Sequence, residues 1–522
     1  MDPAIQQLVD ISGSEAAMQT QADMVLERAR WASQVFQRYD RERTSAIAMA
    51  AASAAHAKAG EYGDWAVRET GFGVAEHKKI KNELSSVPLV EFYQDWDFVN
   101  PRLDERTGIV EIPKPAGVIF ALVPSTNPIA TVYFKVLSAL MTRNAIVLCP
   151  HPAARECCID AVATLSKAAE EAGAPEAIIQ VITHPTIPLI NQFMKSEKTD
   201  VILATGGTAM VRAAYSSSNP AIGVGPGNAP VFVDDTADLT AAARHIVASK
   251  GFDNSVLCTN ESVLITLTAI ADKLTRELAK AGAHICSQEE TDILRSYLFH
   301  ERGFNVEAVG RDAVWIAEQA GFKVPKKIRV LVAPIDLVGV GEDLSREKLC
   351  PVLALYVASG VKQAIMQARA LLRLSGAGHS AAIHSTDTPT IIDYSAAVEV
   401  YRVVVNAPCS QGAAGFDTNL APTFTIGTGF FGRSSVGENI GPQHLINWTR
   451  IAWHTQSDHT VSALDLAAMR HPGPLPKAPA DGVPGETRPK RSLSTTGDLP
   501  NGDLREQIRK IIVEELRGVL KD

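Results

Sequence analysis

Cys258 stands in a turn between two segments that would carry a thiol to the edge of a sheet. Residues 239–249 before it have a helical pattern, and residues 262–265 after it form a short apolar, strand-like run. The turn also carries three polar neighbours: Asn254, Thr259 and Asn260. Only the thiolate is a competent nucleophile, and a free thiol with a pKa of ~8.5 needs polar or positive surroundings to ionise at neutral pH. We therefore predict a nucleophilic cysteine; the alternative is a buried structural thiol.

The composition is that of an ordinary globular chain with room for two or three domains. The chain has 522 residues, of which 46% are apolar and 21% charged, and its net charge of −8 argues against nucleic-acid or anionic-membrane partners. Its seven cysteines are scattered, without zinc-type spacing, so we expect neither a disulfide framework nor a metal site. A reducing compartment, the cytoplasm, follows from this cysteine usage. No long apolar run or signal-like N-terminus is present, so we predict no membrane span.

The chain changes character twice before Cys258. Residues 1–85 are rich in alanine and poor in glycine, which predicts helices, whereas residues 91–111 are aromatic and favour strands or an extended arm. From residue 117 onward, strands at 117–123, 145–149, 178–182 and 201–204 alternate with helices at 129–141, 153–172, 187–196 and 209–216. Continuous apolar strands separated by helices indicate a parallel sheet covered on both faces, which binds ligands at the carboxyl ends of its strands.

The turn Thr205-Gly206-Gly207-Thr208 is a candidate phosphate site, because it joins a predicted strand to a predicted helix. Glycines allow the backbone to approach a pyrophosphate closely, and the free N–H groups at a helix start favour an anion. The motif is not GxGxxG, and a double glycine at a helix start is often only a tight turn. The turn alone therefore leaves both interpretations open.

The last twenty residues, 503–522, predict an amphipathic helix that follows a linker rich in Pro, Gly and Ser. Its apolar residues form one stripe at helical spacing: Leu504, Ile508, Ile511, Ile512, Leu516, Val519 and Leu520. A helix this short is marginal alone in water, so we expect its stripe to occupy a partner's groove. The alternative is docking on its own enzyme body or on a neighbouring subunit.

Seven segments, in one order, resemble the aldehyde dehydrogenase superfamily and, more specifically, the CoA-acylating aldehyde dehydrogenases of bacterial microcompartments. The segments are VPSTNP at 123–128, CPHP at 149–152, ATGGT at 204–208, GVGPGN at 223–228, the Cys258 turn, EKLCPV at 347–352 and GHS at 378–380. The resemblance covers about residues 20–465. It implies an α/β fold with two Rossmann-like parallel-sheet domains, an oligomerisation arm and a C-terminal amphipathic helix.

The resemblance implies a role for each matching residue. Cys258 matches the nucleophile, and Asn127 matches the side-chain donor of the oxyanion hole, whose second donor is the Cys258 backbone N–H. His379 is a candidate acceptor of the CoA thiol proton, the alternative being a structural histidine. Glu347 matches the carboxylate that holds a cofactor ribose; otherwise it is a solvated loop charge. The expected cofactor-binding residues are Pro124, Ser125, Thr126, His151, Pro152, Thr205, Gly206, Gly207 and Glu347.

Val224-Gly225 stand where the water-using branch of the superfamily carries a glutamate base. Without that base, the acyl-enzyme should wait for a thiol nucleophile. The resemblance thus implies oxidation of a short aliphatic aldehyde (propionaldehyde or acetaldehyde) to acyl-CoA, with NAD and coenzyme A as cofactors. Two alternatives remain: a non-acylating aldehyde dehydrogenase that releases free acid, and a catalytically inactive scaffold subunit.

The resemblance also implies a homodimer or homotetramer, located in the cytoplasm inside a bacterial microcompartment. Residues 503–522 would bind the shell or co-packaged enzymes. The predicted organisation is N-terminal helices and arm, belonging to the cofactor domain, at 1–115; a dinucleotide-binding domain at 116–250; a catalytic cysteine domain at 251–430; an oligomerisation segment at 431–470; a flexible linker at 471–502; and a targeting helix at 503–522.

Overall fold

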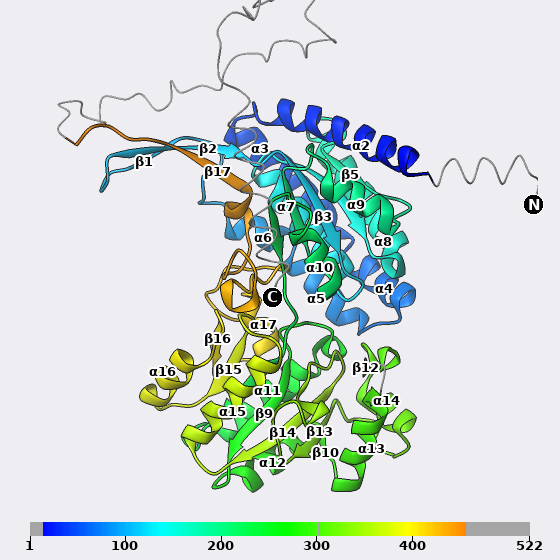
Figure 1. Ribbon diagram of the computed structural model, residues 1–522, viewed down its shortest axis with the longest axis vertical. Helices are drawn as coiled ribbons and strands as arrows, with labels where there is room; N and C mark the ends of the chain where they lie inside the picture. The colour runs from blue at the N-terminus through cyan, green and yellow to red at the C-terminus, as the bar shows by residue number, and fades with distance from the viewer. Residues whose placement is uncertain (1–13, 301–302, 456–522) are drawn as a thin grey trace, which may run out of the picture. The chain divides into compact units, whose positions relative to one another are not determined.

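The computed structural model describes residues 14–300 and 303–455, and its N-terminal part is helical, as the alanine-rich sequence predicts (Figure 1). The helices are α2 (Glu15–Phe36), α3 (Arg41–Ala57), α4 (Ala59–Thr70), α5 (Ala75–Leu84) and α6 (Val87–Phe92). Ser14 and Asp40 cap α2 and α3, since each side chain accepts a backbone N–H that the first turn leaves free. Leu26, Phe36 and Ile47 are fully buried in the core that these helices share with the first sheet.

The first sheet is parallel and has the strand order β5-β4-β3-β6-β7. Its strands are β3 (Val118–Val123), β4 (Ala145–Pro150), β5 (Ile179–Val181), β6 (Val201–Ala204) and β7 (Ala221–Gly223). They alternate with α7 (Pro128–Met141), η1 (Pro152–Ala154), α8 (Arg155–Glu171), α9 (Ile187–Lys195) and α10 (Thr208–Tyr215). Because the strand order reverses between β3 and β6, the loops that leave these two strands open a crevice at the carboxyl edge.

The second sheet has seven parallel strands in the order β10-β13-β14-β9-β8-β15-β16. These are β8 (Ala229–Val233), β9 (Glu261–Leu267), β10 (Ala283–Ile285), β13 (Val330–Ile335), β14 (Val352–Ala358), β15 (Ala381–His384) and β16 (Val403–Val405). Phe232 packs into the core on one face, whereas its neighbours Val231 and Val233 pack into the core on the other. Both faces are therefore covered, as continuous apolar strands require.

Helices surround the second sheet, and short elements complete it (Figure 1). The α-helices are α11 (Leu239–Lys250), α12 (Ala271–Lys280), α13 (Gln288–Leu298), α14 (Ala313–Ala320), α15 (Val361–Leu374), α16 (Thr388–Ala397) and α17 (Cys409–Ala413). The 3-10 turns are η2 (Phe252–Ser255), η3 (Val306–Ala308), η4 (Asp343–Ser345), η5 (Phe430–Gly432) and η6 (Pro442–Leu445), and β11 (Phe299–His300) pairs with β12 (Gly303–Phe304). The predicted α/β fold with two parallel sheets is confirmed.

The predicted domain boundary at residue 250 is wrong. β8 and α11 precede it, yet β8 pairs with β9 and β15 of the second sheet. The chain changes sheets between Gly223, where β7 ends, and Ala229, where β8 begins. An apolar run shows that it is a strand, but not which neighbours it pairs with, so the pattern of residues 229–233 fits either sheet.

The arm is a small antiparallel sheet in the order β1-β2-β17 (Figure 1). β1 (Arg102–Asp104) and β2 (Ile109–Pro115) lie in or next to the predicted arm, and β17 (Ile446–Ile451) pairs with β2 from the far end of the chain. The Arg102 guanidinium stacks 4.1 Å from the Trp448 ring centre, which links β1 to β17 across β2. The part of the predicted arm before Asn100 differs, since residues up to Phe92 end helix α6.

No helix among the described residues is long and apolar enough to span a membrane. The predicted linker at 471–502, the predicted helix at 503–522 and the end of the predicted oligomerisation segment, residues 456–470, lie outside the described residues.

Candidate active site

A cavity of about 330 Å³ lies between the two parallel sheets. One wall comes from the loops after β3 and β6 of the first sheet, and the other from segments that enter β8, β9 and β14 of the second. The structure brings together most of the residues selected from the sequence: Pro124, Ser125, Thr126, Asn127, His151, Thr205, Gly206, Gly207, Cys258 and Glu347. The carboxyl edge of one sheet therefore faces the amino edge of the other across the site.

The first-sheet end of the cavity has the features of a phosphate cradle. Thr205 Oγ1 is buried and has no hydrogen-bond partner among the described residues. A Cβ placed on Gly207 would meet no atom within 4 Å, so this glycine is not explained by contacts inside the chain. Among the described side chains none caps the start of α10, which leaves its first N–H groups free. These features fit the pyrophosphate of a dinucleotide.

The turn before Cys258 has a strained backbone, which a hydrogen bond to a distant loop helps to hold in place. Asp253, Asn254 and Ser255 all have positive φ (50°, 50° and 64°), a region that non-glycine residues rarely adopt and that often marks functional sites. Asn254 Nδ2 donates to the carbonyl of Gly310 at 2.9 Å, which ties the turn to a distant loop.

The expectation that polar neighbours favour the Cys258 thiolate is wrong. Asn254 bonds to Gly310, and Thr259 Oγ1 donates to the carbonyl of Ser410 at 2.9 Å. Burial, reinforced by the carboxylate of Glu347, raises the pKa of the Cys258 thiol to about 12. Cys258 is half-buried and lines the cavity, where burial favours the neutral thiol over the thiolate.

Glu347 supplies the only carboxylate among the described residues that line the cavity. Its Oε1 accepts the backbone N–H of Gly227 at 3.2 Å, and burial raises the pKa of the Glu347 carboxyl to about 7. Val224 and Gly225, at the position of the missing base, also line the cavity. The backbone here lies very close to the backbone of Cys258, because a Cβ on Gly227 would stand 2.0 Å from the Cys258 carbonyl oxygen.

Asn127 begins helix α7 at the cavity wall. Its Nδ2 donates to the carbonyl of Val256 and to Thr126 Oγ1, each at 3.3 Å, and its Oδ1 accepts from Lys81 Nζ. Since Val256 stands two residues before Cys258, the amide N–H group points toward the segment that carries the thiol. This is the side on which an oxyanion donor is needed.

Two selected residues lie outside the cavity. His379 is fully buried, its Nδ1 lies 3.0 Å from Ser380 Oγ, and its Nε2 has no partner among the described residues. Burial, followed by the charge of Arg402, lowers the pKa of His379 to about 3, so this ring is a poor proton acceptor at neutral pH. The structural-histidine alternative fits this position better. Pro152 begins η1 and is exposed beside His151.

The sequence analysis missed part of the lining. Thr131, Pro226, Val256, Leu257, Thr259, Leu349, Ala414 and Thr423 also line the cavity. Phe424 and Ile426 line it too, whereas the neighbouring Thr425 is fully buried, as are Cys409 and Ser410. No local pattern marks residues 414–426 as part of the site, because only the tertiary fold carries this loop to the thiol.

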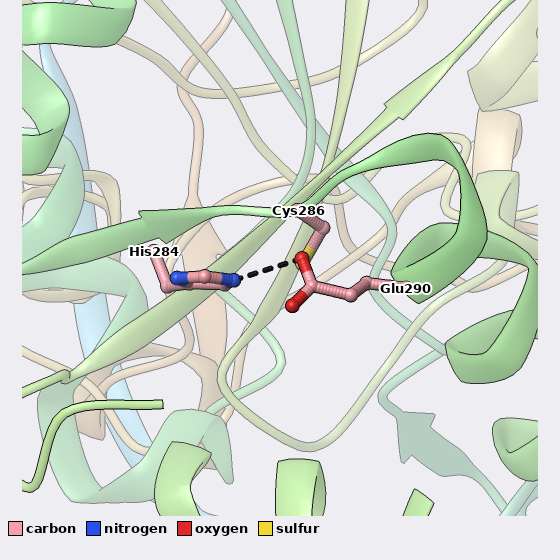
Figure 2. A group of neighbouring side chains, drawn as sticks. All are labelled: His284, Cys286 and Glu290. Carbon is pink, nitrogen blue, oxygen red and sulfur yellow. Dashed lines mark hydrogen bonds and ion pairs between the residues drawn. The ribbon is translucent and has the colours of Figure 1, made fainter. Parts of the chain in front are cut away.

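A second group of chemically active side chains lies at the edge strand β10: His284, Cys286 and Glu290 (Figure 2). Their possible metal-ligand atoms lie within 4.8 Å of one another. His284 Nε2 is 3.0 Å from Glu290 Oε2, and that oxygen also accepts the N–H of Ser287 at 2.8 Å in a capping box. Capping of α13 therefore accounts for Glu290, and burial raises the pKa of Cys286 to about 12.

The sequence pattern of the aldehyde dehydrogenase family matches residues 2–451, and the chain belongs to this family. It is 40% identical over 436 residues to an aldehyde-alcohol dehydrogenase of Clostridium acetobutylicum. The matched region is 82% of this chain and 50% of that protein. The chain thus spans about half the length of the first curated relatives it matches. It is also 34% identical over 431 residues to a succinate-semialdehyde dehydrogenase (acetylating) of Clostridium kluyveri, covering 82% of this chain and 95% of the relative.

Solved structures of related enzymes are also similar to this chain in fold. An acetylating aldehyde dehydrogenase from Geobacillus thermoglucosidasius has a TM-score of 0.83 and 37% identity, with 85% of this chain and 98% of that chain covered. A propionaldehyde dehydrogenase from the Clostridium phytofermentans fucose utilisation bacterial microcompartment has a TM-score of 0.75 and 28% identity, with 83% and 97% covered. The chain therefore shares its fold with these two acylating-type dehydrogenase structures.

Proposed function

We propose that this chain is an NAD-dependent, CoA-acylating aldehyde dehydrogenase that converts a short aliphatic aldehyde to its acyl-CoA. The observation that carries the proposal is the single cavity that joins Cys258, the Asn127 amide and the turn around Gly206 and Gly207. The acetylating relatives support the acylating chemistry. Val224-Gly225, at the position of the water-activating base, argue against release of free acid.

The chain's own residues perform the covalent steps. The Cys258 sulfur bonds to the aldehyde carbon, and the thiol proton passes to the carbonyl oxygen as the thiohemiacetal forms. The Asn127 N–H group and the Cys258 backbone N–H stabilise the developing oxyanion, and one such donor typically contributes ~3 kcal/mol. Residues 205–207 would hold NAD⁺, which would supply the hydride acceptor when the thiohemiacetal is oxidised to the thioester; the hydroxyl proton of the thiohemiacetal would leave to solvent in the same step. The CoA thiol then takes the acyl group and returns its proton to Cys258.

The remaining selected residues have roles around this centre. Pro124, Ser125, Thr126 and His151 would bind the cofactor from the loops of the first sheet, and Glu347 would hold a ribose. At a pKa of about 7, Glu347 is ionised in a large fraction of molecules and can accept hydroxyl hydrogen bonds.

The decisive experiment measures NADH formation at 340 nm from acetaldehyde and propionaldehyde, with and without CoA. The proposal expects sustained turnover only with CoA, and acyl-CoA as the product. Sustained turnover to free acid without CoA would establish the non-acylating alternative, and no NADH with any aldehyde would establish the scaffold alternative.

The arm supports a homodimer or homotetramer. Within the described residues, β17 forms one edge of the sheet β1-β2-β17, which would let its outer backbone groups pair with a strand of another subunit. Such strand addition would leave the cavity intact, because the cavity is lined by residues 124–426.

Residues 503–522 would direct the enzyme into a microcompartment by binding its shell or co-packaged enzymes. Two observations support this: the single apolar stripe that follows a linker, and the similarity to a microcompartment propionaldehyde dehydrogenase. Deletion of residues 490–522 should leave turnover of the purified enzyme near normal and disperse it from the compartment. A fluorescent protein fused to residues 490–522 that stays diffuse in compartment-forming cells would contradict the targeting role.

A further inference from the structure

Three charged side chains are buried behind the cavity, and the covalent mechanism does not use them. Lys78 and Lys81 project from α5, and Asp253 belongs to the strained turn five residues before Cys258. Their side chains are only 3%, 2% and 0% exposed. Lys78 Nζ lies 3.1 Å from Asp253 Oδ2, and Lys81 Nζ contacts the same oxygen. Burying such charges is costly unless each finds specific partners, so the arrangement calls for a functional explanation.

The contacts of the two lysines join both halves of the site. Lys78 Nζ donates to the carbonyl of Thr126 at 2.9 Å, and Lys81 Nζ donates to Asn127 Oδ1. Asp253 Oδ1 in turn accepts the backbone N–H of Val74 at 2.6 Å, directly ahead of α5. One helix therefore holds the exit loop of β3 and the turn that carries the nucleophile.

The Lys81 contact also determines which end of the Asn127 amide faces the thiol. Burial lowers the pKa of Lys81 to about 7, while the adjacent Asp253 carboxylate favours the charged form. In that form the ammonium group only donates hydrogen bonds, so it requires the amide oxygen of Asn127 on its own side. A flipped amide would place its NH2 group against the ammonium and would turn a carbonyl oxygen toward the developing oxyanion. The N–H side, by contrast, now faces Val256 and the Cys258 segment.

We propose that Lys81 is a positioning residue that holds Asn127 with its N–H group toward the Cys258 side, while Asp253 and Lys78 hold Lys81 and the two loops in register. This inference rests on the proposed function, because the orientation matters only if Asn127 stabilises an oxyanion. Lys78 and Lys81 lie on α5, which precedes both sheets in the chain. They therefore stand far from Asn127 and Cys258 in the sequence.

The test is a double-mutant cycle on kcat for CoA-dependent NADH formation. Loss of one oxyanion donor lowers kcat by ~100- to 1000-fold, so Asn127→Ala should fall in that range, and Lys81→Met should lose about 10- to 100-fold. Because Lys81 acts through Asn127, the double variant should be no slower than Asn127→Ala alone. KM for NAD should stay near the wild-type value in all three variants.

Lys79→Met is the matched control, since Lys79 lies on the same helix with a side chain that is 41% exposed and pairs with Glu76 and Glu83. It should retain wild-type kcat. Lys81→Gln keeps an N–H donor in a neutral side chain and should recover part of the loss; it replaces Lys81→Met in the cycle if the methionine variant does not fold. Losses that multiply in the double variant, or wild-type kcat in Lys81→Met, would overturn the proposal.

Crystal structures of the wild type and of Lys81→Met separate this proposal from the proposed function. The positioning role expects Asn127 to rotate or to occupy two conformers in the variant, whatever the enzyme's activity. An unmoved Asn127 refutes the positioning role, whereas an inactive wild type with an ordered Asn127 refutes the proposed function instead.

Discussion

Gly227→Ala tests how closely the backbone of residues 224–228 approaches the nucleophile. An added Cβ would lie 2.0 Å from the Cys258 carbonyl oxygen, 2.9 Å from its carbonyl carbon and 3.0 Å from Glu347 Oε1. Two of these partners are backbone atoms, which cannot rotate away as a side-chain tip can. Restoring an ordinary contact of more than 3 Å therefore requires a movement of about 1 Å, and a misplacement of that size can lower the rate ~100-fold.

The assay is steady-state NADH formation with saturating CoA, together with thermal unfolding of the same preparations. Gly227→Ala should lose about two orders of magnitude in kcat because the Cys258 backbone has moved. Gly360→Ala is the matched control, since its Cβ would meet no atom within 4 Å and its backbone at φ −179° suits any residue. Wild-type kcat in Gly227→Ala, or an equal loss in Gly360→Ala, would refute the reasoning.

Four further outcomes are expected. Cys258→Ala should abolish NADH formation while NAD still binds; more than a few per cent residual activity would remove Cys258 from its role. Without CoA, rapid mixing should show a burst of NADH near the active-site concentration followed by slow turnover, because the thioester lacks a water-activating base. The folded-state pKa of Glu347 is about 7, above the ordinary 4.5, so the folded protein holds this proton more tightly than the unfolded chain does. The unfolding free energy of the wild type should therefore fall by up to ~3 kcal/mol as pH rises from 4.5 to 7. Glu347→Gln lacks this carboxyl, so its stability relative to the wild type should increase over the same pH range. A difference in unfolding free energy that stays constant from pH 4.5 to 8 would contradict it. Light scattering at micromolar concentration should report a dimer or tetramer, and a monomer would contradict the proposed pairing at β17.

Local pattern was enough to predict β3, β4, β5 and β6 of the first sheet, but not its edge strand β7. The apolar run at 117–123 becomes β3, and the turn at 205–208 lies between β6 and α10. These features depend on the alternation and length of apolar runs and on glycine at a turn, all of which act over a few residues. The ordered set of short motifs then identified the family, and it predicts Cys258 as the nucleophile.

Other features depend on contacts between residues that are far apart in the sequence, and only the tertiary structure shows them. Residues 229–233 joined the second sheet because β8 pairs with β9 and β15, and no strand pattern encodes that choice of neighbours. Asn254 and Thr259, near Cys258, donate hydrogen bonds to the carbonyls of residues distant in the sequence. Burial raises the pKa of the Cys258 thiol instead of lowering it. Lys81 reaches Asn127 from 46 residues away and Asp253 from 172 residues away. Charge, burial and hydrogen-bond partners are properties of the assembled fold, so only the folded chain shows how the Cys258 turn and Asn127 are held together.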